Sequence, residues 1–480
     1  LKKSKSHAAK LLAGPEVEHF DQTVALVVAE TFEQARDAAK LVQIDYAPGQ
    51  GRYDLAAEKP EAVTPKGGPF GSPDSQVGNF ETAFSGAPVQ VDSTFTTPDH
   101  SHMMMEPPAS IAAWHGDQLL LWTSNQMIAW AVRDTSEILG ISHEKIHISS
   151  RFIGGGLGAK LWVRSDAILA AVAARLFKRP VKVALARTQV PNNTTHRPAT
   201  IQRVRIGATK DGKILAIAHE NWSGNLHGFR EERSGAQTRL LYAGANRLVT
   251  HKLATLDLPE GNAMRAPGEA VGHLSLEVAM DELAERLNLD PVQLRILNDT
   301  QHDPEKGPER PFSSRKLVEC LREGAQKFGW AQRNPKPGQV REGHWQIGLG
   351  VASALRNNPT LASAARVRID KKGHITVETD MTDIGTGSYT VLAQTAAEMM
   401  GVPLHQVTVK LAESHYPQSC GSGGQFGGNS STSGVYAACV LLRSKLAQQA
   451  GWDPVVTTFE NGKVSSAGQS KSLAEAAGPK

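Results

Sequence analysis

The residues best suited to chemistry lie in glycine-rich segments that follow apolar, strand-like stretches. The first segment, residues 151–160, has the sequence RFIGGGLGAK and holds Gly154, Gly155, Gly156 and Gly158. Glycines between a strand and a helix let the backbone turn sharply and come close to a bulky ligand. Exposed amide groups in such a loop suit a phosphate or another acceptor-rich group. The segment therefore predicts a ligand-binding loop.

Other interpretations of this loop can be compared with the residues around it. A P-loop is excluded, because Lys160 is followed by Leu161 and not by Ser or Thr. The pattern Gly154-x-Gly156-x-x-Ala159 fits a dinucleotide fingerprint, but no ribose-binding acid ends the next expected strand within residues 180–190. A tight turn without a ligand also stays open.

Two later segments repeat the arrangement of glycines before a helix. In MTDIGTGSYT, residues 381–390, a strand meets Gly385-Thr386-Gly387 and a helix is expected over 389–400. The segment CGSGGQFGGNSSTSG, residues 420–434, precedes an expected helix over 435–450, although its composition also fits a flexible linker. Three such loops at helix N-termini would together hold a long, multiply hydrogen-bonding anion.

Two arginines stand where expected elements end and could meet a ligand. Arg265 lies in NAMRAPGEA, where a strand ends and a helix begins, and Arg356 closes an alternating apolar run. From spacing alone, each is more simply a surface arginine. The cluster of His102, three methionines and Glu106 is better explained by packing than by copper, and no protein metal site is expected.

Composition limits the classes of protein. The net charge is +4 and no Lys/Arg block lies beyond the first ten residues, which argues against nucleic-acid binding. No apolar run reaches the roughly 18 residues of a membrane span. Cys320, Cys420 and Cys439 are far apart, so neither a disulfide framework nor an iron–sulfur site is expected.

The length of 480 residues predicts more than one domain. We expect a small α/β unit ending near residue 56 (strand–helix–strand over 23–46), a linker over 57–78, a domain over 79–310, a linker over 311–342 and a domain over 343–480. Helices are expected over 127–139, 165–177, 273–289 and 314–327, and strands over 343–358, 364–380 and on both sides of an Asp211-Gly212 turn. The chain starts at Leu1 and ends in a helix-like segment, so we expect it to be truncated at both ends.

The glycine motifs and the arginine segment occur in a recognisable order along nearly all of the chain: GGGLGAK, NAMRAPGEA, LEVAMDELAERLNLDPVQLRILN, TDIGTGSYTVLAQTAAEMMGVP and GSGGQFGGNSSTSGVYAAC. This order resembles the large molybdenum-binding subunit of the xanthine oxidase/aldehyde oxidase family of molybdenum hydroxylases. It is most similar to the bacterial periplasmic aldehyde oxidoreductases, whose subunit binds molybdopterin cytosine dinucleotide. The resemblance implies a multi-domain α+β fold of mixed sheets with flanking helices. It makes residues 1–56 hammerhead-like and residues 79–310 and 343–480 two molybdopterin-binding domains, the second incomplete.

The resemblance also implies roles for single residues. Cofactor contacts are expected at Leu157, Gly158, Arg265, Ile384, Gly385, Thr386, Gly427 and Gly428. Arg356 matches the active-site arginine of the aldehyde enzymes and could orient an aldehyde oxygen. Leu161 stands where purine-oxidising relatives have a glutamate, which favours an apolar, aromatic aldehyde over xanthine.

The chain also departs from the family pattern. The family usually has Phe and Gly at positions 157 and 159, where this chain has Leu157 and Ala159. The glutamine that lies over the metal in relatives aligns with Ser124, with Gln126 nearby. No match to the catalytic glutamate occurs in this sequence, and we expect that residue beyond residue 480.

The implied activity is oxidation of aldehydes to carboxylic acids with water as the oxygen source. Three scattered cysteines cannot hold the electron-transfer clusters, so an iron–sulfur subunit and an FAD subunit are implied, with a cofactor-insertion chaperone, as a periplasmic heterotrimer. A cytoplasmic location is the alternative. An NAD-dependent dehydrogenase using the first glycine loop and a non-catalytic cofactor-binding fragment stay open as other functions.

Overall fold

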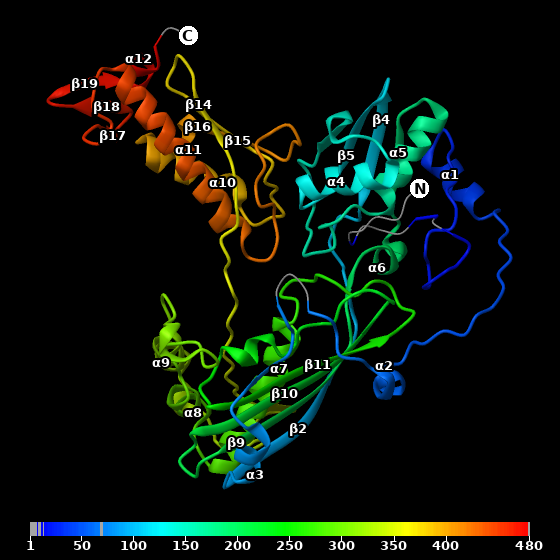
Figure 1. Ribbon diagram of the computed structural model, residues 1–480, viewed down its shortest axis with the longest axis vertical. Helices are drawn as coiled ribbons and strands as arrows, with labels where there is room; N and C mark the ends of the chain where they lie inside the picture. The colour runs from blue at the N-terminus through cyan, green and yellow to red at the C-terminus, as the bar shows by residue number, and fades with distance from the viewer. Residues whose placement is uncertain (1–6, 8–10, 13, 68–70, 479–480) are drawn as a thin grey trace. The chain divides into compact units, whose positions relative to one another are not determined.

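The computed structural model describes residues 7, 11–12, 14–67 and 71–478 of the chain. These residues form two compact units, each built from separate segments (Figure 1). Unit 1 comprises residues 1–48, 102–195 and 357–480, and unit 2 comprises residues 49–101 and 196–356. Among the described helices, none is both long enough and apolar enough to cross a membrane.

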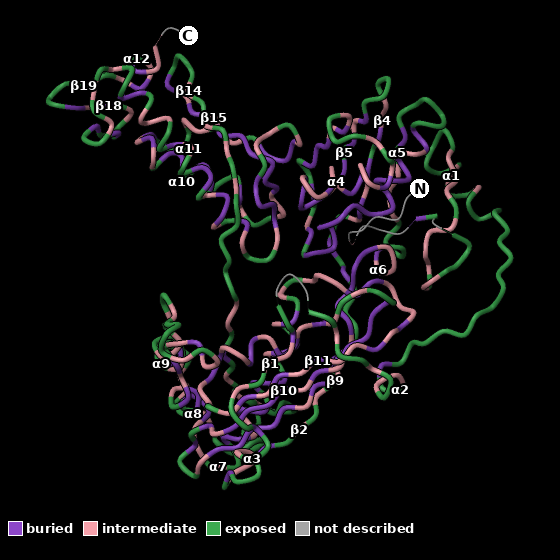
Figure 2. The backbone as a smooth tube through the Cα atoms, in the orientation of Figure 1, coloured by how far each residue is buried: buried purple, intermediate pink, exposed green. Residues whose placement is uncertain are grey.

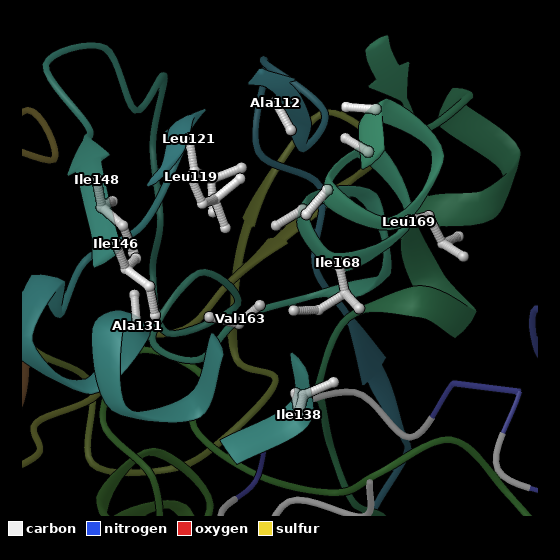
Figure 3. Close-up of a cluster of buried hydrophobic side chains, with 14 of the residues drawn as sticks. Ala112, Leu119, Leu121, Ala131, Ile138, Ile146, Ile148, Val163, Ile168 and Leu169 are labelled. Atoms are coloured by element: carbon white, nitrogen blue, oxygen red, sulfur yellow. The ribbon is translucent and has the colours of Figure 1, made fainter. Parts of the chain in front are cut away.

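The first half of unit 1 is a four-stranded mixed sheet with two helices on one face. Its strand order is β6-β5-β4-β7, and β4 runs antiparallel to both of its neighbours. The elements are β4 (Ala109–His115), β5 (Gln118–Thr123), α4 (Ile128–Leu139), β6 (Ile146–Ser149), α5 (Ser165–Phe177) and β7 (Val181–Ala184). Apolar side chains of the helices and strands, such as Ile168, Leu119 and Leu121, interlock in one core (Figure 3). This core fixes the starting point of the first glycine loop, which leaves the end of β6.

The second half of unit 1 packs two long helices on a smaller sheet of order β14-β15-β16. Its elements are β14 (Arg366–Ile369), β15 (Ile375–Thr379), α10 (Ser388–Met400), β16 (Val407–Leu411) and α11 (Gly427–Gln449). A hairpin layer completes it, with β17 (Thr458–Glu460), β18 (Lys463–Ser466), β19 (Gln469–Ser472) and the short helix α12 (Leu473–Ala477). The helices α1 (Phe32–Ala39) and α6 (Val190–Asn193) complete the regular elements described for unit 1.

Unit 2 is organised around a five-stranded sheet of order β1-β11-β10-β9-β2. The strands are β1 (Ser75–Val77), β2 (Val89–Thr97), β9 (Thr200–Ala208), β10 (Ile214–Asn225) and β11 (Asn246–Thr255). Helix α3 (Phe80–Ser85) covers one face through Ala216 and Ala218, and α7 (Glu269–Leu287) covers the other through Ile217. Figure 2 shows the buried residues running along β9 and β10 between these helices.

Shorter elements surround this sheet: α2 (Leu55–Glu58), β3 (His100–Ser101), β8 (His196–Arg197), α8 (Pro291–Leu297), α9 (Leu317–Phe328), β12 (Val340–Glu342) and β13 (Trp345–Ile347). The prediction of a multi-domain α+β fold with mixed sheets and flanking helices is confirmed. The expected turn at Asp211-Gly212 joins β9 to β10, and Gly212 has a φ of +92° there. That left-handed conformation explains the glycine at this position.

Some expected strands do not form in the described residues. Residues 23–30 and 43–46 contain no strand, so the predicted strand–helix–strand unit has only its helix. Leu26 and Val28 instead pack against the apolar core of the first half of unit 1. Similarly, the strand expected over 343–358 is limited to Trp345–Ile347. An apolar run alone does not form a strand, because a strand also needs a partner.

Candidate functional site

The first glycine loop is a strained turn in unit 1. Leu157 has a φ of +57°, a conformation that costs energy for a residue with a Cβ. A Cβ added at Gly156 would lie 2.5 Å from Oε1 of Gln126, so this glycine allows a close approach. The loop does not lead directly into a helix, because α5 begins at Ser165, after Arg164. The sheet beside it is also not of the dinucleotide type, because β4 runs antiparallel to its neighbours.

The second glycine loop enters the N-terminus of α10, as predicted. The carboxylate of Asp383 accepts hydrogen bonds from the amides of Gly385 (2.8 Å) and Thr386 (3.0 Å) and from the amide of Tyr389 (3.3 Å). Asp383 thus shapes the turn from within, a role that the glycine pattern alone did not indicate. Ile384 lies inside this turn, and Gly387 is the N-cap of the helix.

The third loop is shorter than predicted, because α11 begins at Gly427 and not near residue 435. The expected loop residues Gly427 and Gly428 therefore form the first turn of a helix. Ser430 is fully buried and accepts a hydrogen bond from the amide of Leu361 (3.0 Å). A Cβ at Gly434 would lie 2.6 Å from the carbonyl oxygen of Ser363. The small residues therefore allow a helix to pack against a neighbouring segment, which overrides their low helix propensity.

The three loops meet within unit 1. Asp380, just before the second loop, accepts a hydrogen bond from the amide of Ser419, just before the third (2.5 Å). Leu161, just after the first loop, lies 3.0 Å from a Cβ added at Gly423 in the third. The predicted cofactor-binding residues of the three loops all belong to unit 1: Leu157, Gly158, Ile384, Gly385, Thr386, Gly427 and Gly428.

The two predicted arginines, Arg265 and Arg356, belong to unit 2. Arg265 lies in the turn before α7, where Ala266 has a φ of +61° and Gly268 a φ of +78°. The buried guanidinium of Arg197 donates hydrogen bonds to the carbonyl oxygens of Arg265 (2.6 Å) and Ala266 (3.0 Å). Arg197 therefore holds this strained turn in place.

Arg356 is positioned by one face of α7. Glu269, His273 and Glu277 recur every fourth residue and so lie in one row along the helix. Glu269 Oε1 lies 3.4 Å from Nε of Arg356. His273 Nε2 accepts the amide of Leu355 (3.2 Å), and Glu277 accepts the amide of Ser353 (2.5 Å). Arg356 lines a cavity of about 680 Å³ in unit 2.

A buried carboxyl group supports the turn that carries Arg265. Glu232 accepts a hydrogen bond from the amide of Gly268 (2.5 Å). Burial raises the pKa of Glu232 to about 7, and the negative charge of Glu269 adds to this effect, while Arg197 opposes it. This carboxyl group is thus close to half-charged near neutral pH.

Replacing Glu232 by glutamine is expected to change how stability depends on pH. Because the folded-state pKa is raised, the parent loses stability as the pH rises from about 4.5, where the unfolded carboxyl ionises, through about 7. Glutamine keeps an acceptor for Gly268 but carries no charge. The free energy of unfolding of the variant, relative to that of the parent, should therefore increase by about 3 kcal/mol from pH 4 to pH 8, measured by urea unfolding. The exposed Glu309→Gln is the control and should show no such gain.

Sequence reasoning named Gln126 only as a neighbour of the position where relatives have a glutamine over the metal, and it missed the contacts of Gln126 with the loops. It also missed Arg197 and Glu232. The four-residue recurrence of polar residues on α7 was a readable signal, whereas nothing near Gln126 in the sequence indicated its contacts.

One further polar cluster joins the two halves of unit 1. Ligand atoms of His147, Glu413 and His415 lie within 4.8 Å of one another. Both carboxylate oxygens of Glu413 already have partners: Oε1 accepts from Arg151 Nε (2.5 Å) and Ser149 Oγ (2.9 Å), and Oε2 lies 3.1 Å from His147 Nε2. The cluster is therefore explained by ion pairing.

Comparison with protein families matches three models to this chain. Residues 64–299 and 323–480 each match a molybdopterin cofactor-binding domain. Residues 2–50 match the a/b hammerhead domain of aldehyde oxidase and xanthine dehydrogenase.

Two groups of relatives show the extent of the likeness. The chain is 59% identical, over 99% of its length, to the aldehyde oxidoreductase molybdenum-binding subunit PaoC of Escherichia coli K12, and it spans 64% of that protein. It is 28% identical, over 84% of its length, to a putative xanthine dehydrogenase molybdenum-binding subunit of the same organism, of which the match covers 55%. Among solved structures, quinoline 2-oxidoreductase from Pseudomonas putida 86 has the same fold, with a TM-score of 0.81 at 23% identity over 94% of this chain and 62% of that one.

Proposed function

Because this chain belongs to the xanthine oxidase family of molybdopterin-binding proteins, we propose that it is the cofactor-binding part of a molybdenum-dependent aldehyde oxidoreductase. The observation that carries this proposal is the meeting of three glycine loops within one unit, in a chain 59% identical to PaoC. The reaction is oxidation of an aldehyde to a carboxylic acid, with water as the oxygen source.

The loops fit a long anionic cofactor. The N-termini of α10 and α11 present a partial positive charge to a phosphate group. Among the described atoms, none lies within 4 Å of a Cβ added at Gly385, Gly387 or Gly428, so a ligand has room beside these glycines. We assign molybdopterin cytosine dinucleotide to Leu157, Gly158, Ile384, Gly385, Thr386, Gly427 and Gly428. When bound, this group supplies the metal centre for oxidation of the aldehyde carbon.

The arginines of unit 2 contribute positive charge to the reaction. Arg265, on a turn that Arg197 and Glu232 hold, would bind the molybdenum–pterin group. Arg356 orients the aldehyde oxygen and stabilises negative charge that develops on it. Leu161, where purine-oxidising relatives have a glutamate, favours an apolar aromatic aldehyde.

Electrons leave through partner subunits in this proposal. Cys420 and Cys439 are buried and Cys320 is exposed, and all three are far apart in the sequence. An iron–sulfur subunit and an FAD subunit therefore complete a heterotrimer, which a chaperone loads with cofactor and which is exported to the periplasm.

Metal and nucleotide analysis tests the proposal. The complete protein, purified from its own host, is expected to contain about one molybdenum atom per chain and to release cytidine monophosphate on acid hydrolysis. It should oxidise benzaldehyde without added NAD. The same protein from cells grown with tungstate is the control and should lack both molybdenum and activity. Absence of molybdenum and cytidine nucleotide from protein made with a competent maturation system would refute the proposal, and NAD-dependent activity would favour a dehydrogenase.

A further inference from the structure

The segment of unit 2 that leads to Arg356 has the exposure pattern of a strand, although residues 348–357 belong to none of the strands described. Ser353 is buried and Leu355 is half-buried, whereas Ala352 and Ala354 are exposed. This period of two is typical of an extended chain, in which alternate residues point their backbone amides in the same direction. Such amides need acceptors, and no neighbouring strand supplies them.

Side chains of α7 accept the amides of this segment. Glu277 Oε2 accepts from the amide of Ser353 (2.5 Å), and His273 Nε2 accepts from the amide of Leu355 (3.2 Å). The acceptors are four residues apart on the helix, which is about 6 Å along its axis. The donors are two residues apart, which is about 6.6 Å along an extended chain. The two spacings match, so the helix takes the place of a strand partner.

The bond to Leu355 requires a neutral ring in His273. Because Nε2 accepts the hydrogen bond, it carries no proton, and the ring proton lies on Nδ1. Burial lowers the pKa of His273, while the negative charge of Glu277 and the backbone of Glu269 oppose this effect. The ring is therefore an acceptor at neutral pH.

The part of α7 that carries His273 is firmly anchored. A Cβ added at Gly272 would lie 1.8 Å from the carbonyl oxygen of Ser234, so this glycine lets the helix pack directly on a neighbouring backbone. The carbonyl oxygen of Val271 accepts a hydrogen bond from Nε2 of Gln202 on β9 (3.3 Å). The helix cannot slide or rotate without breaking these contacts, so the position of the ring is fixed.

Arg356 directly follows the residue that His273 holds. Its Nε lies 3.4 Å from Oε1 of Glu269, one helical turn before His273. That pair alone does not fix the backbone, because two long side chains can follow a shift of the chain. The bond at Leu355 removes this freedom at the adjacent residue.

We propose that His273 is a positioning residue that holds the backbone beside Arg356, so that the guanidinium meets the aldehyde oxygen in one orientation. This inference rests on the proposed function, in which Arg356 acts on the aldehyde. His273 contacts neither substrate nor cofactor in this role and acts through Leu355. A charge held in advance needs less reorganisation in the transition state, so loss of the bond lowers kcat more than it raises KM.

The test is His273→Leu, which removes the acceptor, made in the complete protein with its partner subunits. We expect kcat/KM for benzaldehyde to fall at least tenfold, mainly in kcat, with unchanged molybdenum content. Glutamine can place Oε1 near the position of Nε2, so His273→Gln should stay within threefold of the parent. Asparagine is too short to reach the amide. His273→Asn should therefore behave like the leucine variant, and it replaces that variant should His273→Leu fail to fold.

A double-mutant cycle separates positioning from a general loss of stability. In an Arg356→Ala background, His273→Leu should change kcat/KM by less than twofold, because its effect passes through the guanidinium. Effects that multiply would overturn the proposal. The control is His344→Leu, at an exposed histidine in the turn between β12 and β13, and it should leave kcat/KM unchanged.

Hydrogen exchange tests the same bond without cofactor or activity. In protein made without molybdenum cofactor, the amide of Leu355, resolved from overlapping peptides, should exchange at least tenfold faster in His273→Leu. It should stay within twofold of the parent in His273→Gln, and residues 214–225 of β10 should not change in either variant.

The outcomes distinguish this inference from the proposed function. Either kcat/KM or exchange at Leu355 within twofold of the parent in His273→Leu would overturn the role of His273. A parent protein without molybdenum or without aldehyde oxidation would refute the proposed function instead. In that case exchange in the cofactor-free protein would still decide whether His273 holds the segment that carries Arg356.

Discussion

Replacing Arg356 by alanine is expected to lower kcat/KM for an aromatic aldehyde by about 10²- to 10³-fold. Its guanidinium lies 3.4 Å from Glu269 at the start of α7, and the preceding residues are held by His273 and Glu277. Such a preorganised charge needs no reorganisation during the reaction, so its removal raises the free energy of the transition state. Lysine should restore only part of the rate, because a point charge does not reproduce the planar guanidinium. Steady-state kinetics of the complete enzyme give the measurement.

The controls for Arg356 separate an effect on catalysis from an effect on cofactor content. Molybdenum content should be the same in the parent and in the variant. Arg341, an exposed arginine on β12, can be replaced by alanine and should leave kcat/KM unchanged. A rate within threefold of the parent in the fully loaded Arg356→Ala enzyme would remove this arginine from the mechanism.

Replacing Arg295 by methionine is expected to destabilise unit 2 by about 3–5 kcal/mol. Arg295 is fully buried and contacts the carboxylates of Glu277 (2.8 Å) and Asp281 (2.9 Å). Tyr242 also donates to Glu277 (2.6 Å). Without the guanidinium, the charge of Glu277 would stay buried with only neutral donors. Urea unfolding at neutral pH measures the loss.

A second substitution tests this explanation for Arg295. The double variant Arg295→Met with Glu277→Gln removes the unpaired charge and keeps an acceptor for Tyr242. It should recover at least half of the lost stability. A double variant no more stable than Arg295→Met would show that packing, and not charge, causes the effect. Because Glu277 also holds Ser353, the single variant should disturb the segment that leads to Arg356.

Local patterns predicted the elements whose signals are local. The helix expected over 127–139 is α4, which ends where Gly140 takes a φ of +69°, and the helix expected over 165–177 is α5 with the same bounds. The glycine pattern also predicted the turn at residues 153–160 and the turn before α10. Apolar periodicity and glycine punctuation are properties of neighbouring residues, so a single sequence contains them.

The features that the sequence did not predict depend on contacts between residues far apart in the chain. The segment around Ser430 is predicted as a binding loop, with a flexible linker as the alternative, yet its small residues pack as the first turns of α11 against Leu361 and Ser363. The contacts of Gln126 gave no local signal, because its partners Thr382 and Ser422 lie more than 250 residues away along the chain. The turn at Arg265 and the end of an apolar run at Arg356 were evident, but not the buried groups that hold these segments.

The alternation of the chain between the two units has a consequence for its synthesis. When the ribosome has added residue 356, every segment of unit 2 exists, while unit 1 still lacks residues 357–480. Unit 2 can therefore complete its sheet first, whereas residues 102–195 must wait for the last quarter of the chain to supply two of the three loops. During that interval the first glycine loop lacks its contacts with the second and third loops, so a nascent chain that stalls there would expose it to chaperones and proteases.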